Sequence, residues 1–130
     1  MLRAEDQQHL ESLDLPFVLA ADGGLVCVVI SGWPLPPGYA PEHTDLLLRL
    51  PAGFPDAAPD MYWCEPFIRV VATGSFPQAA DQMETYLGRT WQRFSRHLSA
   101  GQWQPGRDNL ASYLALIRHE LASTAPATTP

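Results

Sequence analysis

The sequence predicts an α+β fold, with a helix near each end of the chain and an antiparallel sheet between them. Two observations lead to this prediction. Apolar and β-branched runs separated by turn residues fill residues 17–63, and a helical spacing of apolar residues appears in the segments on either side. The 130 residues make up one domain's worth of chain, enough to bury a core without disulfides or metals. We therefore expect a single domain over residues 1–123 and a disordered tail over residues 124–130.

A short helix and a meander of strands form the first half of the predicted fold. Ala4–Leu13 is mostly polar, but Leu10 and Leu13 lie three positions apart and give it one apolar edge before Pro16. An Asp-Gly-Gly turn at residues 22–24 predicts a hairpin, because glycine adopts the positive φ of tight hairpin turns. Four strands are expected to follow one another as an antiparallel meander: Phe17–Ala21, Leu25–Ser31, Thr44–Leu50 and Asp60–Trp63.

The segments between and after these strands are predicted to be irregular. Gly32–Tyr39 contains three prolines, which fix φ and lack an amide donor, so no regular structure is expected there. Pro51–Pro59 is a second rigid loop. Residues 65–90 show no clear period, and we expect a loop with one short helical turn near Ala79–Tyr86.

The C-terminal helix is predicted over Asp108–Ser123. Asp108 follows a Pro-Gly pair and is a good N-cap residue. The apolar residues of this segment step by four, three and four positions, which places them on one helical face. That face is expected to lie on the sheet: Leu110, Leu114, Ile117 and Leu121.

The composition favours a soluble cytoplasmic protein that does not bind nucleic acid. The formal net charge is −6, whereas nucleic-acid binding requires a basic face. No apolar run approaches the length of a membrane span, and no basic leader precedes an apolar stretch. The two cysteines, Cys27 and Cys64, form no metal-binding pattern and are expected to be reduced. We expect no metal or cofactor. All eight residues counted as lysine or arginine are arginine.

Two separated segments resemble the ubiquitin-conjugating (E2) superfamily, which has the UBC fold. Leu50–Pro59 follows the Pro-x-x-Tyr-Pro-x-x-x-Pro pattern of that superfamily, with Phe54 in the tyrosine position. Trp103-Gln104-Pro105 matches its Trp-x-Pro motif, and an amphipathic helix follows. Together with the string WQRFSRH at residues 91–97, these motifs are similar to prokaryotic E2 family E.

This resemblance implies an E2-like enzyme of a bacterial ubiquitin-like conjugation pathway. Its partners would be an E1-like (ThiF-type) activating enzyme, a β-grasp ubiquitin-like protein and the target proteins. In E2 enzymes the thioester-forming cysteine lies eight residues before the Trp-x-Pro motif, and here that position holds Ser95. No His-Pro-Asn tripeptide precedes the segment, so the asparagine that stabilises the oxyanion in ordinary E2 enzymes is missing.

Ser95 needs a base, because a serine hydroxyl forms essentially no alkoxide at neutral pH. His97 stands two positions further along and would share a side with Ser95 on an extended segment. Arg93 stands two positions before it and could stabilise an oxyanion in place of the missing asparagine. We predict that Ser95 accepts the ubiquitin-like protein as an oxyester, with His97 as general base. Gln92 is a weaker candidate donor.

Other interpretations remain open from the residues alone. Ser95 could be inert, which would make the chain a non-catalytic E2 variant that binds the ubiquitin-like protein or the E1. Cys64 could be the acceptor thiol, although its place beside a strand is typical of a buried residue. A serine esterase is disfavoured because the chain has no Gly-x-Ser-x-Gly elbow. The acidic side chains of the first helix are either the E1-docking surface or a plain solvated face: Glu5, Asp6 and Glu11.

Overall fold

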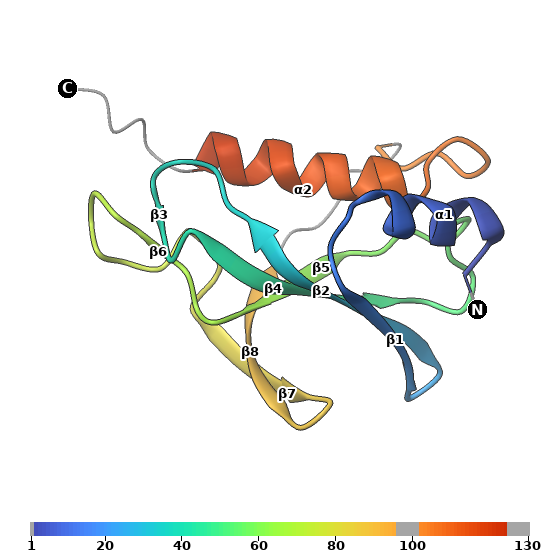
Figure 1. Cartoon of the computed structure of the whole chain (residues 1–130), viewed down its shortest axis with the longest axis horizontal. Helices are drawn as coiled ribbons and strands as arrows, with labels where there is room; N and C mark the ends of the chain where they lie inside the picture. The colour runs from blue at the N-terminus through green and yellow to red at the C-terminus, as the bar shows by residue number, and fades with distance from the viewer. Residues whose placement is uncertain (1, 96–101, 125–130) are drawn as a thin grey trace.

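The computed structural model describes residues 2–95 and 102–124 as an α+β domain with two helices and eight strands (Figure 1). The helices are α1 (Ala4–Ser12) and α2 (Leu110–Thr124). The strands are β1 (Phe17–Asp22), β2 (Leu25–Pro34), β3 (Tyr39–Ala40), β4 (His43–Leu50), β5 (Met61–Glu65), β6 (Arg69–Val70), β7 (Gln82–Tyr86) and β8 (Arg89–Ser95).

Six of the strands form one sheet in the order β1-β2-β4-β5-β8-β7, and all neighbouring strands are antiparallel. The four predicted strands are confirmed as β1, β2, β4 and β5, which follow one another as a meander. Strands β3 and β6 form a separate two-stranded sheet. The sheet therefore extends two strands beyond the predicted meander, on the side of β5.

The two hairpin turns of the large sheet share one backbone geometry. Gly23 and Gly24 have φ of 59° and 82°, which are the two positive values that a two-residue type I′ hairpin turn requires. This turn confirms the predicted hairpin. The β7–β8 turn repeats the pattern with Leu87 at 55° and Gly88 at 75°.

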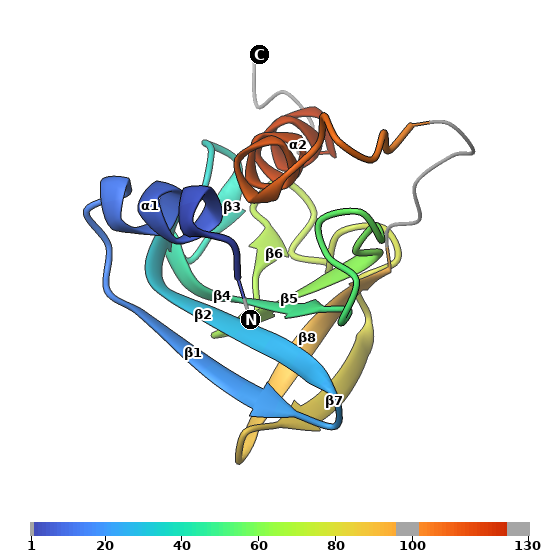
Figure 2. The same ribbon diagram turned by 90° about the vertical axis from the view of Figure 1, so that its right-hand side faces the viewer.

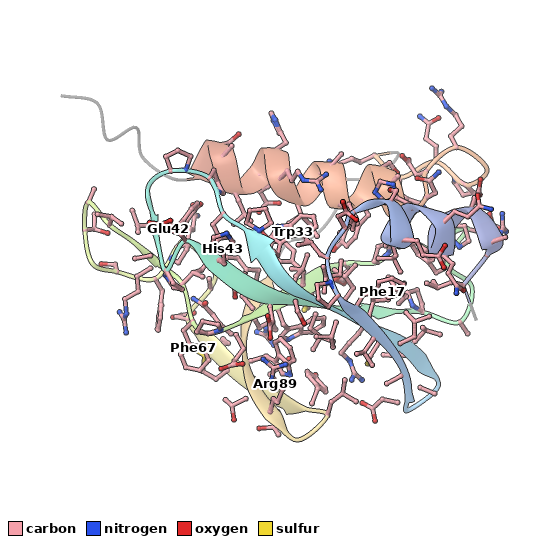
Figure 3. The ribbon with its side chains drawn as sticks, in the orientation of Figure 1. Phe17, Trp33, Glu42, His43, Phe67 and Arg89 are labelled. Carbon is pink, nitrogen blue, oxygen red and sulfur yellow. The ribbon has the colours of Figure 1, made fainter. Side chains whose placement is uncertain are left out.

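The prediction of irregular structure from Gly32 was wrong for the first residues of that segment. Strand β2 continues to Pro34 because a β-bulge between Ile30 and Trp33 re-registers it against β4. Gly32 has φ of 71° in the bulge, and its amide donates to the Asp45 carboxylate at 3.1 Å. The bulge turns Trp33 into the core, between β2 and α2 (Figure 3).

The prediction of a loop over residues 65–90 holds for residues 66–68 and 71–81, but the helical turn near Ala79–Tyr86 was wrong. Gln82–Tyr86 is strand β7, and it pairs along its whole length with β8. Cross-strand pairing with β8 replaces the expected helical contacts. As a result, β8 lies between β5 and β7 rather than in an irregular segment.

Both helices cover the same face of the large sheet and lie side by side on it (Figures 1 and 2). The main core lies between them and the sheet. The predicted apolar face of α2 is confirmed, since its four members are at most 1% exposed: Leu110, Leu114, Ile117 and Leu121. A second, smaller cluster occupies the opposite face of the sheet: Cys27, Val29, Leu47, Trp63 and Trp91.

The N-cap of α2 is Asn109 rather than the predicted Asp108. The Asn109 side chain accepts from the Ser112 amide at 3.0 Å, and the Ser112 hydroxyl accepts from the Asn109 amide at 2.8 Å. This reciprocal pair is a capping box, and it outcompetes the cap one residue earlier. Asp108 instead accepts a hydrogen bond from the Gln104 amide at 2.7 Å.

Asp6 of α1 is buried against the start of α2 and does not belong to an exposed acidic face. Its carboxylate accepts from the Leu110 amide at 3.1 Å, and the residue is 1% exposed. A carboxylate at a helix N-terminus satisfies an unpaired N–H and interacts favourably with the helix dipole. Glu5 and Glu11 are exposed, so only these two of the three acidic residues can contact a partner.

Replacing Asp6 is expected to destabilise the docking of the two helices. An Asp6→Ala variant should lose about 1–2 kcal/mol of unfolding free energy, because the buried Leu110 amide loses its acceptor. Urea unfolding followed by circular dichroism measures this loss. Glu5→Ala is the matched control, since Glu5 is exposed in the same helical turn. Equal midpoints for the two variants would contradict the capping role.

Candidate functional site around Ser95

Ser95 is the last residue of β8 and lies on the sheet face opposite the helices. Its cross-strand partner is Met61 of β5, and its amide donates to the Ala79 carbonyl at 3.0 Å. Side chains alternate between the two sheet faces along β8. Trp91 packs in the second cluster and Phe94 packs in the main core, so Ser95, four positions after Trp91, lies on the face of the second cluster. Ser95 is half-buried, and its backbone is held by pairing with β5 on one side and by the Ala79 carbonyl on the other.

Arg93 shares this face and contacts Ser95 directly. The Arg93 Nε donates a hydrogen bond to the Ser95 Oγ at 3.0 Å. The regular strand places residues two apart on one side, which brings these two sequence-predicted residues together. A guanidinium cannot accept a proton at neutral pH, so Arg93 can stabilise negative charge on an oxygen but cannot act as the base.

The guanidinium of Arg93 is held in turn by Glu84 of β7. The Arg93 Nη1 donates to the Glu84 Oε2 at 2.7 Å. The other oxygen, Oε1, accepts from the Trp63 indole at 2.9 Å and from the Tyr86 hydroxyl at 3.0 Å. Burial alone would raise the pKa of Glu84, but the hydrogen bonds from Trp63, Tyr86 and Arg93 outweigh it and hold the pKa below its ordinary value.

Sequence reasoning missed these supporting residues. Glu84 and Tyr86 fall in the segment for which a helical turn was expected, whereas the strand places both on the Ser95 face, opposite Trp91 and Arg89. The β-prone residues on both sides of a Leu-Gly pair, in the string TYLGRTW at residues 85–91, are the signal that could have predicted the hairpin.

Two further arginines on this sheet face are paired with carboxylates. Arg89 contacts Asp45 at 2.9 Å and also Glu65, and it lies on the side of the sheet away from α2 (Figure 3). Arg49 pairs with Asp22 at 2.6 Å and lies 3.8 Å from the centre of the Tyr86 ring.

The contact between Arg49 and Tyr86 also indicates how the sheet curves on this face. Two strands separate β4 from β7 in the sheet, yet Arg49 on β4 stacks on Tyr86 of β7. The twisted sheet therefore bends over the second cluster, and the hairpin of β7 and β8 closes one side of it.

A shallow cleft of about 300 Å³ opens on the same face beside Ser95. It extends from β2 to the loop that precedes β5, and most of its lining is apolar, with Arg49 on one wall. Met61 lines the cleft and is the cross-strand partner of Ser95, so the cleft begins one strand away from the serine. Its lining residues are Leu25, Arg49, Pro51, Ala58, Pro59, Asp60, Met61 and Trp63.

The predicted base, His97, lies outside the described residues, as does Arg96. Gln92 is described, and it is not a donor to the Ser95 site. Its side chain is fully buried on the opposite face of β8, where it bonds the backbone of Ile68 and Ala80. Gln92 therefore holds the segment after β5 against β8.

The two thiols are both buried. Cys64 faces the main core and Cys27 faces the second cluster, and both are 0% exposed. Burial raises the pKa of each thiol, and a hydrogen bond with Thr44 only partly opposes this for Cys64. Because the thiolate is the nucleophile, neither cysteine is placed to accept an acyl group from a partner.

This burial predicts that the native thiols resist modification. In native buffer, dithionitrobenzoate should label the protein far more slowly than a small free thiol, and in denaturant it should label both cysteines. The absorbance of the released thiolate measures the reaction. Rapid labelling of one thiol in native buffer would contradict the burial and reopen Cys64 as an acceptor.

The two segments that carry the family motifs meet at Trp103. Its indole donates to the Pro55 carbonyl at 2.8 Å, and its ring lies 6.0 Å from Phe54 and 6.1 Å from Tyr113 of α2. Tyr113 in turn donates from its hydroxyl to the Met61 carbonyl at 3.0 Å, in the strand pair that holds Ser95. The proline loop, the Trp-x-Pro motif and the Ser95 strand thus form one connected unit.

The family profile of prokaryotic E2 family E matches residues 2–124, nearly the whole chain. The chain belongs to prokaryotic E2 family E. Membership indicates an E2-like, transferase-type role in ubiquitin-like conjugation and interaction in general with a ubiquitin-like protein and an E1-like enzyme. No curated protein and no solved structure matches the chain.

Two features are absent from residues 2–95 and 102–124. Neither helix in these ranges is long and apolar enough to cross a membrane. The same part of the chain holds no group of three or more His, Cys, Asp or Glu side chains that could bind a metal ion.

Proposed function

We propose that this family E protein is a UBC-fold E2-like transferase that carries a ubiquitin-like protein on Ser95. A ThiF-type E1 would deliver the C-terminus of a β-grasp ubiquitin-like protein, and a target amine would receive it. The observation that carries the proposal is the 3.0 Å hydrogen bond from Arg93 Nε to Ser95 Oγ. This bond holds the permanent positive charge of Arg93 beside Ser95, where negative charge develops during acyl transfer.

The first step exchanges a thioester for an oxyester. Ser95 Oγ attacks the carbonyl carbon of the E1-bound thioester, so a C–O bond forms and the C–S bond breaks. The serine proton passes to a base, for which His97 is proposed, and the E1 thiolate leaves. In the second step a target amine attacks the oxyester, a C–N bond forms, the C–O bond breaks and Ser95 regains a proton.

The cleft beside Ser95 supports this reaction. Met61 lines the cleft and is paired with Ser95, so an extended C-terminal peptide lying in the cleft would have its end beside the serine. The apolar lining suits an extended peptide, and the Arg49 guanidinium on the wall is a donor for its carbonyl oxygens.

A charging assay tests the proposal. The protein is mixed with its E1, the ubiquitin-like protein and ATP, and the products are separated with and without thiol reductant and after hydroxylamine treatment. The expected adduct survives reductant, is cleaved by hydroxylamine and is absent from Ser95→Ala. An adduct that forms equally well on Ser95→Ala would refute the proposal.

The second candidate is a non-catalytic E2 variant that holds the ubiquitin-like protein or the E1. The observation that favours it is the Glu84–Arg93 ion pair, whose carboxylate accepts hydrogen bonds from Trp63 and Tyr86. Ion-pair networks of this kind also occur as purely structural elements. This candidate predicts binding without any covalent adduct, unchanged by Ser95→Ala. Calorimetric titration of the same components, run beside the charging assay, separates the two functions.

A further inference from the structure

The Glu84 carboxylate is fixed from two sides, and this bears on the orientation of Arg93. Trp63 and Tyr86 donate to one oxygen, and their rings pack edge to face with centres 5.5 Å apart. Aromatic side chains have only two side-chain torsions, so they define the position of the carboxylate well. The remaining oxygen then presents a fixed acceptor to Arg93.

An arginine side chain without such an acceptor would populate several rotamers, because it has four rotatable bonds and much rotamer entropy to lose. Here the contact at Nη1 with Glu84 leaves Nε directed at the Ser95 Oγ. The guanidinium is planar and its five N–H groups have fixed directions, so holding one nitrogen sets the direction of the others. Arg93 and Glu84 are each about three-tenths exposed, so geometry rather than strong burial defines the pair.

We infer that Glu84 is a positioning residue for acyl transfer to Ser95, acting through Arg93, with Trp63 and Tyr86 as its supports. The inference rests on the proposed function. Glu84 does not itself contact the reacting oxygen in this arrangement. It directs the Arg93 Nε towards the place where the oxyanion of the thioester carbonyl or the serine oxygen develops charge.

Electrostatics alone makes the opposite prediction. The negative charge of Glu84 weakens the positive potential that Arg93 exerts at Ser95, so removing that charge should speed acyl transfer if orientation did not matter. A glutamine at position 84 removes the charge. It also keeps a single oxygen, which can accept from Arg93 or from the two aromatic donors but not from both sets. The sign of the change in rate therefore distinguishes positioning from simple charge.

The experiment compares initial charging rates of the wild type, Glu84→Gln, Arg93→Gln and the double variant, with the E1, the ubiquitin-like protein and ATP. We expect Arg93→Gln to be slower by about 100-fold, as when an oxyanion donor is removed, and Glu84→Gln by about 10-fold. The double variant should be no slower than Arg93→Gln, because Glu84 acts only through Arg93. A purely structural role would instead make the two effects multiply.

Glu65→Gln is the matched control. Glu65 also pairs with an arginine on this sheet face, but its partner is Arg89, at the opposite end of β8 from Ser95. It should charge at the wild-type rate. Trp63→Phe and Tyr86→Phe each remove one donor to Glu84 while keeping a ring, and each should slow charging by a smaller factor. They test the same inference if Glu84→Gln does not fold.

The possible results separate this inference from the proposed function. If Ser95→Ala still charges, the proposed function fails and the inference fails with it. If charging requires Ser95 but Glu84→Gln charges at or above the wild-type rate, only the inference is overturned. The same holds if the two single effects multiply in the double variant. Slower charging of Glu84→Gln with no further loss in the double variant supports the inference.

Discussion

A Ser95→Cys variant is expected to carry the ubiquitin-like protein as a thioester that reductant cleaves, and to charge faster than the wild type. A cysteine has an ordinary pKa near 8.5, so part of it is thiolate at neutral pH without any base. The Arg93 guanidinium, which lies 3.0 Å from the serine oxygen, would stabilise that thiolate further. We expect the charging rate to rise by about 10-fold or more, because the general-base step becomes unnecessary.

The same gels report this change, since the wild-type adduct should resist reductant and the variant adduct should not. Ser75→Cys is the matched control, because Ser75 is an exposed serine outside the Ser95 face and should gain no adduct. If Ser95→Cys forms no adduct with active E1, the position is not reached by the E1 thioester, and the non-catalytic E2 variant would then be favoured.

The parts of the fold predicted well from sequence are those with a clear period and ordinary turn residues. The face of α2 and the β1–β2 hairpin were both found, because leucine spacing and the Gly-Gly turn are strong local signals. The β7–β8 hairpin was missed because its turn has Leu87 at positive φ, where a side chain other than asparagine or aspartate is uncommon. Its strands also carry mostly polar residues, which hide their alternation.

Some residues of the candidate site could likewise be placed from the sequence and others were not. Placing Arg93 and Ser95 on one face needed only the two-residue period of a strand, and the structure has both on β8. Glu84 was not placed from sequence, since its contact with Arg93 depends on the register of the missed hairpin, which pairs Gln82 with Arg93. Asp6 shows a similar limit, because its partner Leu110 is 104 positions away and only the packing of α1 beside α2 brings them together.

Gln92→Leu is expected to produce the largest loss of stability among single substitutions near the site, about 3–5 kcal/mol of unfolding free energy. The buried Gln92 side chain donates to the carbonyls of Ile68 and Ala80 at 3.1 and 2.9 Å and accepts from the Ile68 amide at 2.7 Å. Leucine fills a similar volume but satisfies none of these groups. Each buried backbone group left without a partner costs roughly 1–3 kcal/mol, which offsets the gain from an added apolar side chain.

Urea unfolding with a fluorescence readout measures this loss, and Gln82→Leu is the matched control. Gln82 is exposed on β7, so its replacement should change the unfolding free energy by about 0.5 kcal/mol or less. The loss should also reach the Ser95 site, because Ala80 follows Ala79, whose carbonyl accepts from the Ser95 amide. Gln92→Leu should therefore charge more slowly than the wild type even at urea concentrations below the unfolding midpoint of the variant, where it is still folded. A variant as stable as Gln82→Leu would show that the Ile68 and Ala80 groups find other partners and that Gln92 does not hold this segment against β8.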